Sequence, residues 1–503
     1  MYPHVKSSLR AAVRLPLQFP AFQSKVRMPL RRHVPTHLRS SRLGVPEARV
    51  SVVSYQLLRK EFVVSQHVAS YEHVLSYKEV VENVFDRLYA VSWPVFIGKD
   101  FWHTANTLDT CVDFIIEGSK HWDLSDRRKT VQNMIQDSYD YFGVVYKDQN
   151  QPGKDSPNVW WDDYGWWGIT FTKIHQNFTT IFAGSQPRIT KENCLEVARK
   201  CWSALGGYSE KVNRSVQPPQ KGPVAGGCWN HPPADGGIQN TVTNGLYLVL
   251  SARLYQNSNE KDVLQAAAAQ YLWFRNWFVN YLMKQKECPL PGKQQGLFRC
   301  LEPSGAAKLL VIYERAIDPA NPRYNQGNPP FFDGQLWTGD QGLFLGGLAS
   351  IVDIRQQIGT VDIIKQQDPT FPENAMKMAL WVASGVSWLF DPSSVLHEAP
   401  LNDAFGTSFA ADMATGKGVM MRYLDYAMSK IGLNPRTYIT HSAAAVVSTK
   451  NDAGDVNFQW NTRTDTRIGT NESEVEKTDP RFQPTAQSAG LDALNAGIQY
   501  LRQ

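Results

Sequence analysis

Apolar residues recur at helical spacing in segment after segment, from about residue 72 to the end of the chain. Such spacing gathers apolar side chains on one face of a helix, and that face must pack against another element. The clearest segments are residues 77–91, 108–118, 130–145, 245–256, 266–283, 342–358, 374–390 and 418–431. Alternating strand patterns are rare and short, with residues 309–317 the best candidate for a small hairpin. The pattern predicts a mainly α fold.

Two connectors between the predicted helices, residues 217–237 and 318–334, are long and rich in proline and glycine. They exceed ordinary helix–helix turns, and long loops in a compact helical domain are usually functional. We expect both to line the mouth of a binding site. No repeat of fixed period and no shift in composition divides the chain after residue 70, which predicts one large domain.

The N-terminal segment differs in charge from the rest of the chain. Residues 1–50 hold ten Lys or Arg, several prolines and a single acid, Glu47, whereas the residues after them carry 42 basic and 46 acidic groups. We therefore expect residues 1–66 to form a disordered basic extension and residues 67–503 to form the folded domain. Because the domain shows no stripe of Lys and Arg that could follow phosphates, nucleic acid is not an expected partner.

The sequence leaves the compartment open. An Arg-rich, acid-poor leader resembles a mitochondrial transit peptide, but its prolines favour a disordered tail or a mis-annotated start. No apolar run is long enough for a secretory signal or for a transmembrane helix of about 18 residues. Sequons at Asn177, Asn213 and Asn471, and a disulfide between Cys288 and Cys300, would nevertheless fit a secreted protein.

The basic extension supplies a first prediction. A segment this polar and interrupted by proline offers little apolar surface to offset its ordering entropy. Removing residues 1–60 should therefore leave specific activity and melting temperature unchanged, and should abolish any salt-sensitive attraction to acidic surfaces. Activity assays and thermal melts of the truncated and full-length chains check this. An unfolded or inactive truncation would place the domain boundary earlier in the chain.

Several familiar catalytic and metal-binding patterns are missing from the sequence. The six cysteines form no C-x-x-C pair, which argues against a zinc ribbon. His397-Glu398 is not followed by a second histidine four residues later, and no G-x-S-x-G turn occurs, so the zincin and serine-hydrolase patterns fail. The glycines of residues 339–347 lack the spacing of a phosphate loop, and we expect them to permit close helix contacts. We expect no metal and no other cofactor.

The stretch Trp160-Trp161-Asp162-Asp163, which Tyr-Gly-Trp-Trp follows, carries the strongest sign of chemistry. Paired carboxylates can divide the work of glycoside hydrolysis, one protonating the leaving oxygen and the other attacking the anomeric carbon. Indole rings suit the apolar faces of pyranoses. The alternative is a helix cap surrounded by core tryptophans. Burying two ionised carboxylates among indoles is costly unless their acidities are pushed apart, as acid/base chemistry requires.

Six blocks of the chain carry a family resemblance. They are residues 101–114 (with W-x-x-A-N), 160–169 (with the paired aspartates), 236–255 (with N-x-x-x-N-G), 336–348 (with W-T-x-x-Q-G), 416–424 (with K-G and R-Y-L) and 485–494 (with T-x-Q-S-A and L-D). In this order and at this spacing they resemble glycoside hydrolase family 76, the α-1,6-mannanases and their fungal cell-wall relatives.

The resemblance implies an (α/α)6 toroid with its long loops at the cleft. It also implies retaining hydrolysis of α-1,6-mannosidic bonds, with carboxyl groups about 5 to 5.5 Å apart. Asp162 would be the ionised nucleophile, and Asp163 would hold the proton as general acid/base. The implied substrate-binding residues are Trp102, Asn106, Trp160, Trp161, Trp166, Asn240, Asn244, Trp337, Asp340 and Gln341. The partner would be α-mannan or a mannooligosaccharide, and we expect a monomer that acts outside the cell or in the cell wall.

The sequence departs from the family pattern beside the expected centre. Gln239 stands where the family has Lys, Gly339-Asp340 where it has Tyr-Asn, and Trp229 is followed by Asn230 rather than a second Trp. These changes bear on the identity of the substrate more than on the type of reaction. Three alternatives therefore remain: a transglycosylase in glycan or cell-wall remodelling, an enzyme recruited to a non-polysaccharide substrate, and a catalytically silent glycan-binding protein.

Overall fold

The computed structural model describes residues 71–149, 159–215, 226–232, 237–279, 296–301, 309–317, 336–398, 414–463 and 484–501. The chain divides into two compact units, Met1–Lys60 and Glu61–Gln503, and all described residues belong to the second. The predicted extension, residues 1–66, and the connector 318–334 lie outside the described residues, as does most of the connector 217–237. No helix of the described ranges is long and apolar enough to cross a membrane.

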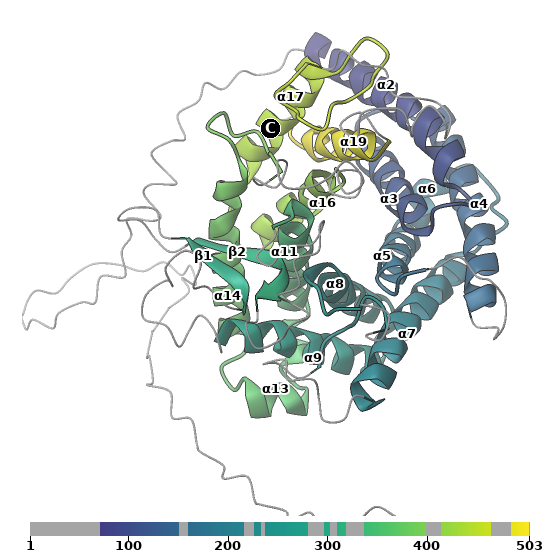
Figure 1. Cartoon of the computed structure of the whole chain (residues 1–503). Helices are drawn as coiled ribbons and strands as arrows, with labels where there is room; N and C mark the ends of the chain where they lie inside the picture. Colours follow the sequence, from purple (N-terminus) through teal and green to yellow (C-terminus); the bar gives the residue numbers. More distant parts are fainter. Residues whose placement is uncertain are drawn as a thin grey trace, which may run out of the picture. The chain divides into compact units, whose positions relative to one another are not determined.

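Twelve of the described helices form two concentric layers (Figure 1). The inner layer consists of α3 (Phe101–Gly118), α5 (Asp163–Gln176), α8 (Thr241–Ser258), α11 (Thr338–Asp353), α16 (Gly416–Lys430) and α19 (Pro484–Ile498). Each inner helix packs on the next, and α19 packs on α3, so the ring is closed. The outer layer consists of α2 (Tyr71–Phe96), α4 (Ser125–Gln149), α7 (Lys191–Ser215), α9 (Lys261–Phe278), α14 (Glu373–Val386) and α17 (Arg436–Thr449). The mainly α expectation is confirmed.

Inner helices are buried on nearly all sides. In α11, every residue from Thr338 to Val352 is buried, as expected for a helix enclosed by others. Its glycines allow close approach: a Cβ on Gly342 would lie 2.6 Å from the Cα of Met420 on α16, and one on Gly346 would meet the Tyr423 ring. This confirms the predicted role of the glycines in residues 339–347.

Smaller elements complete the described part of the chain. The strands β1 (Gly296–Leu301) and β2 (Leu309–Ile317) form an antiparallel hairpin, as the alternating pattern predicted, with Cys300 opposite Leu310. The hairpin packs against α8, α9, α11 and α14. Short helical segments are α6 (Phe178–Ile181), α12 (Arg355–Ile358), α13 (Asp362–Gln367) and η3 (Ser387–Leu389). Cys300 is disulfide-bonded, and Cys111, Cys194, Cys201 and Cys228 are buried free thiols. Cys288 lies outside the described residues.

Inner and outer helices alternate along the chain, so the first turns of the inner helices meet at one end of the ring. The indole of Trp167, near the start of α5, donates to the Phe101 carbonyl at the start of α3 (2.8 Å). Gly416, at the start of α16, lies against the indole of Trp337, which caps α11. This arrangement gathers polar groups from distant parts of the sequence at that end of the ring.

Candidate active site

Asp162 and Asp163 lie at the N-terminal end of α5. Asp162 is the N-cap residue, although its side chain makes no capping hydrogen bond, and Asp163 is the first residue of the helix. The Asp163 carboxylate accepts a hydrogen bond from the backbone N–H of Trp160 (3.2 Å), while the Asp163 N–H donates to the Trp160 carbonyl (3.1 Å). These two hydrogen bonds close a turn that fixes the positions of Asp162 and Asp163. The turn is held in place by a further hydrogen bond, from the backbone N–H of Trp161 to the Asn230 carbonyl (2.8 Å).

The surroundings of Asp162 favour its protonated form. Burial raises the pKa of Asp162 to about 7, and the charge of Glu314 adds to this effect, whereas the Thr243 hydroxyl and the backbone N–H groups of Asp162 and Asp163 lower the pKa. Asp163 accepts from the Trp160 N–H and lies in the first turn of the helix, and both features stabilise an anion. Burial thus favours the neutral form of Asp162, where the resemblance implies an ionised one. The division of roles between the two acids stays a prediction.

The start of α8 lies beside Asp162. The Thr243 hydroxyl is 3.3 Å from Oδ2 of Asp162 and 2.5 Å from Oδ1 of Asn240. Asn240 caps α8 by accepting from the Thr243 N–H (3.3 Å), and its amide nitrogen donates to Oε1 of Glu314 on β2 (3.0 Å). The predicted residue Asn240 is thus linked to the aspartate pair through Thr243, a residue that the sequence alone does not single out.

The four tryptophans of the central motif separate into exposed and buried positions. Trp160 is the most open, with 38% of its surface exposed and its ring stacked on His231 at 4.8 Å. Trp161 is partly buried and stacks on Tyr208 at 5.1 Å. Trp166 is buried, and the centre of its ring lies 5.9 Å from that of the Trp102 ring. Trp167 is fully buried in the core. Trp160 and Trp161 are therefore the members able to present a ring face to a ligand.

This separation gives a second prediction. Trp160→Ala should weaken binding of mannooligosaccharides with little change in melting temperature, because its ring is exposed. Trp167→Ala should cost about 3 to 5 kcal/mol of stability, as deletion of a buried indole generally does. Calorimetric titration with sugar and chemical denaturation of both variants check this. Unchanged sugar affinity in the Trp160 variant would place the stacking platform elsewhere.

Three of the predicted amides are occupied by internal contacts. Asn106 donates to Ser488 (3.3 Å) and accepts from Arg422 (2.9 Å). The Asn244 side chain holds both backbone groups of Cys228 (2.7 and 3.0 Å). Gln341 accepts from the Ile312 N–H (3.0 Å) and donates to the carbonyls of Leu310 and Val382, which fixes the hairpin to α11 and α14. We expect these residues to position the site rather than to bind sugar.

A second group of buried acids surrounds the start of α11. Glu398 accepts from both the backbone N–H (2.6 Å) and the hydroxyl (2.5 Å) of Thr338. Asp340 is fully buried, and neither of its carboxylate oxygens has a hydrogen-bond partner among the described residues. Burial, and then the charges of Glu314 and Glu398, raise the pKa of Asp340 well above its usual range. Burial therefore favours the neutral form of Asp340, at a position where the family pattern has an amide.

Glu314, Glu398 and Lys417 were missed by sequence reasoning. Burial lowers the pKa of Lys417 to about 7, against the charge of Glu398. The one usable signal was Glu314-Arg315, a pair of charges inside the otherwise apolar strand of residues 309–317. In the sequence, Glu398 stands out only beside His397, in a pattern that lacks the second histidine of a zincin. Among the described residues no group of His, Cys, Asp or Glu is arranged to hold a metal ion.

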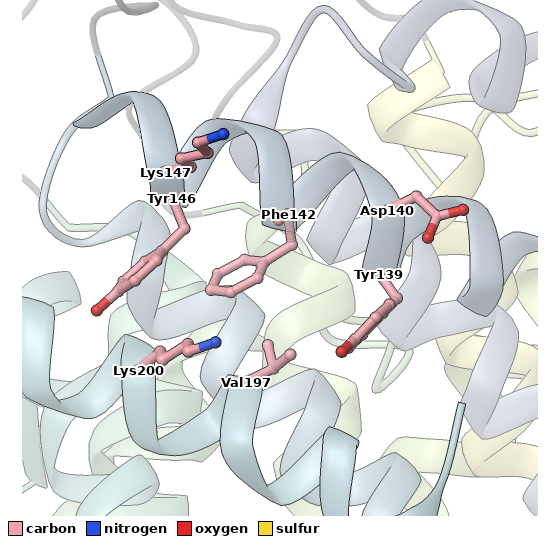
Figure 2. Close-up of a pocket in the computed structure, with 8 residues that line it drawn as sticks. Tyr139, Asp140, Phe142, Tyr146, Lys147, Val197 and Lys200 are labelled. Atoms are coloured by element: carbon pink, nitrogen blue, oxygen red, sulfur yellow. The ribbon is translucent and has the colours of Figure 1, made fainter. Parts of the chain in front are cut away.

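A cavity of about 580 Å³ lies elsewhere, in the outer layer between α4 and α7 (Figure 2). Figure 2 shows Tyr139, Phe142 and Tyr146 on α4 facing Val197 and Lys200 on α7. None of the predicted site residues lines this cavity. We therefore place the candidate active site at the end of the ring where Asp162 and Asp163 lie.

No family model and no curated protein sequence matches the chain, whereas solved structures do. It is similar to an inactive variant of an α-1,6-mannanase of Salegentibacter sp. HEL1_6 in complex with α-1,6-mannotriose, at 15% identity, TM-score 0.51, and coverage of 84% of this chain and 99% of that one. It is similar to Dfg5 from Chaetomium thermophilum in complex with glucosamine, at 15% identity, TM-score 0.57, and coverage of 87% and 92%.

A glycoside hydrolase family 76 mannosidase from Bacteroides thetaiotaomicron is similar at 12% identity and a TM-score of 0.51, with coverage of 85% of this chain and 100% of that one. The likeness therefore extends over most of the described residues and nearly the whole length of these proteins. At such low identity it shows the fold alone. The described part of the chain has the fold of the solved glycoside hydrolases of family 76, a closed ring of paired helices, as the sequence resemblance implied.

Proposed function

We propose that this protein is a glycoside hydrolase of family 76 that cleaves α-1,6-mannosidic linkages with retention of configuration. The observation that carries the proposal is the adjacent pair Asp162 and Asp163 at the first turn of an inner helix. The similar mannanase is a variant made inactive by replacing two consecutive aspartates with asparagine, and it holds α-1,6-mannotriose. The two partly exposed tryptophans beside the pair suit a sugar ligand.

In the proposed reaction, the two acids have the roles that the resemblance implies. Asp163 would protonate the glycosidic oxygen as the bond to the anomeric carbon breaks, while ionised Asp162 attacks the anomeric carbon and forms a glycosyl ester. Asp163, now ionised, would then remove a proton from water, which attacks the ester and releases Asp162.

Linear α-1,6-mannooligosaccharides, with and without an acceptor sugar, test the reaction. The proposal expects shorter α-mannooligosaccharides as first products, and an α-1,2-linked control that stays intact. Transfer to the acceptor in preference to water would make the protein a transglycosylase that uses the same intermediate. Binding without any cleavage would support the glycan-binding alternative. Cleavage of neither linkage would reject the proposed substrate.

Azide rescue tests the two roles separately. With an aryl α-mannoside that needs little acid assistance, Asp162→Gly with azide should give the β-mannosyl azide, because azide replaces the missing nucleophile in a single displacement. Asp163→Gly with azide should give the α-mannosyl azide, because azide intercepts the glycosyl ester. The opposite pairing of variants and products would exchange the two roles.

A further inference from the structure

His231 contacts both tryptophans that precede the aspartate pair. Its ring stacks on the Trp160 indole, with ring centres 4.8 Å apart and an angle of 27° between the planes. The Trp161 ring lies 6.4 Å from His231 at an angle of 53°, and Trp161 stacks in turn on Tyr208. Four aromatic rings therefore follow one another beside the aspartate pair. The reaction proposed above gives His231 no role.

Backbone contacts of the preceding residue, Asn230, place the His231 ring. The Asn230 carbonyl accepts from the Trp161 N–H (2.8 Å), which ties this segment to the turn that carries Trp160. On its other side, the Asn230 N–H donates to the Ile238 carbonyl (3.0 Å), and Oδ1 of Asn230 accepts from the Ile238 N–H (2.8 Å). Because these three hydrogen bonds hold Asn230, the next residue in the chain has a fixed place against Trp160.

A hydrogen bond of Nδ1 does not account for the position of the His231 ring. This nitrogen is buried and has no hydrogen-bond partner among the described residues. Such an atom generally costs about 1 to 3 kcal/mol, so other contacts must favour the position that the ring occupies. The contacts that the structure shows are those with the two indoles, and a stacked aromatic pair contributes about 0.5 to 1.5 kcal/mol beyond its buried area.

The stack leaves one face of the Trp160 indole for a ligand. His231 covers the opposite face, yet 38% of the surface of Trp160 is exposed. The backbone of Trp160 is joined to Asp163 by two hydrogen bonds, one from the Trp160 N–H to the carboxylate (3.2 Å) and one from the Asp163 N–H (3.1 Å). The exposed ring and the aspartate pair therefore belong to the same turn of the chain.

We propose that His231 is a positioning residue that holds the Trp160 indole as a rigid platform, whose uncovered face binds the apolar face of a pyranose unit of the substrate. The inference rests on the proposed function, because it requires a sugar as the ligand. A side chain that is fixed before binding loses less conformational freedom when the ligand arrives. The proposal also gives a role to Asn230, which stands where the family pattern has a second Trp.

Replacement of the imidazole ring tests the effect on the substrate. His231→Ala should raise KM for α-1,6-mannooligosaccharides by about 2- to 10-fold, the equivalent of one aromatic stack, with a much smaller change in kcat. His231→Phe should restore KM, because a phenyl ring can cover the same face of the indole. His441→Ala is the matched control: this histidine lies on α17, where its ring contacts the Ser393 carbonyl (2.8 Å), and both constants should stay unchanged. A loss confined to kcat overturns the proposal.

A double-mutant cycle separates positioning from direct contact with the sugar. Calorimetric titration with a mannooligosaccharide gives the affinity of the wild type, Trp160→Ala, His231→Ala and the double variant. If His231 acts through Trp160, His231→Ala should have no further effect once the indole is absent. An equal loss of affinity in both backgrounds would mean that His231 contacts the sugar itself, and would overturn the positioning role.

The order of the indole can be measured without any sugar. In the full-length chain labelled with fluorotryptophan, Trp160→Phe assigns the ¹⁹F NMR signal of Trp160. His231→Ala should narrow this signal, because the ring gains freedom to move, whereas His231→Phe should keep the wild-type line width. An unchanged line width in His231→Ala overturns the support by His231. Because this reading needs neither sugar nor turnover, failure of the proposed function is distinguishable from failure of this inference. If His231→Ala does not fold, His231→Leu, which fills the space without a planar face, replaces it.

Discussion

Asp162→Asn and Asp163→Asn should each lower kcat on α-1,6-mannooligosaccharides by about 10⁴-fold or more, and the double variant should be scarcely worse. Each acid is needed in both halves of the proposed reaction, so losing either stops the cycle. A neutral amide at residue 162 cannot form the ester, and one at residue 163 cannot release a proton to the leaving oxygen. Initial rates, with covalent trapping by a slow fluorinated substrate, measure the two losses. Activity within tenfold of wild type in either variant would remove the mechanism.

The stability of these variants provides the control. The pKa of Asp162 is raised from 3.8 to about 7, so the folded protein binds more protons than the unfolded chain across this window, and stability falls as pH rises through it. Asparagine removes that dependence. Asp162→Asn should therefore melt at or above the wild-type temperature at pH 8, with an unchanged circular-dichroism spectrum. A lower melting temperature there would mean that the lost activity reflects damage to the fold.

The helices could be predicted from periodicity because each buries a continuous apolar face. Residues 108–118 and 342–358 fall largely within α3 and α11, and the hairpin strand of residues 309–317 coincides with β2. The closure of the ring could not be derived in this way, because α3 and α19 pack together from opposite ends of the sequence. Only the resemblance implied it.

The candidate catalytic pair could be predicted because two acids among four tryptophans are unusual in composition. Its charge state could not, because the burial of Asp162 and its distance from Glu314 depend on where β2 lies in the fold. The same limit applies to Gln341. This residue fits a sugar-binding motif, but its side-chain amide makes hydrogen bonds with three backbone groups. A motif shows which residue type stands at a position, whereas the hydrogen-bond partners of that side chain determine its role.

Arg422 should be the most sensitive ion-pairing position outside the active site, because its partners join the seam where the ring closes. Its side chain is 4% exposed and bonds to Asp492 on α19 (2.8 and 2.9 Å) and to Asp109 on α3 (3.0 Å). It also holds the side chain of Asn106 (2.9 Å) and the hydroxyl of Thr110 (2.6 Å). One guanidinium on α16 therefore links the first and last inner helices.

Arg422→Met should lower the free energy of unfolding by about 3 to 5 kcal/mol, because it leaves the buried carboxylates of Asp109 and Asp492 without their shared cation. Arg422→Lys should recover only part of this, since an ammonium cannot match the planar fork that spans both acids. Arg188→Ala is the matched control: its pair with Asp140 is 66% and 58% exposed and should contribute no more than about 1 kcal/mol. Urea denaturation of the four proteins measures the differences. If Arg422→Met is as stable as Arg188→Ala, apolar packing alone holds the ring closed, and the buried ions contribute nothing to that closure.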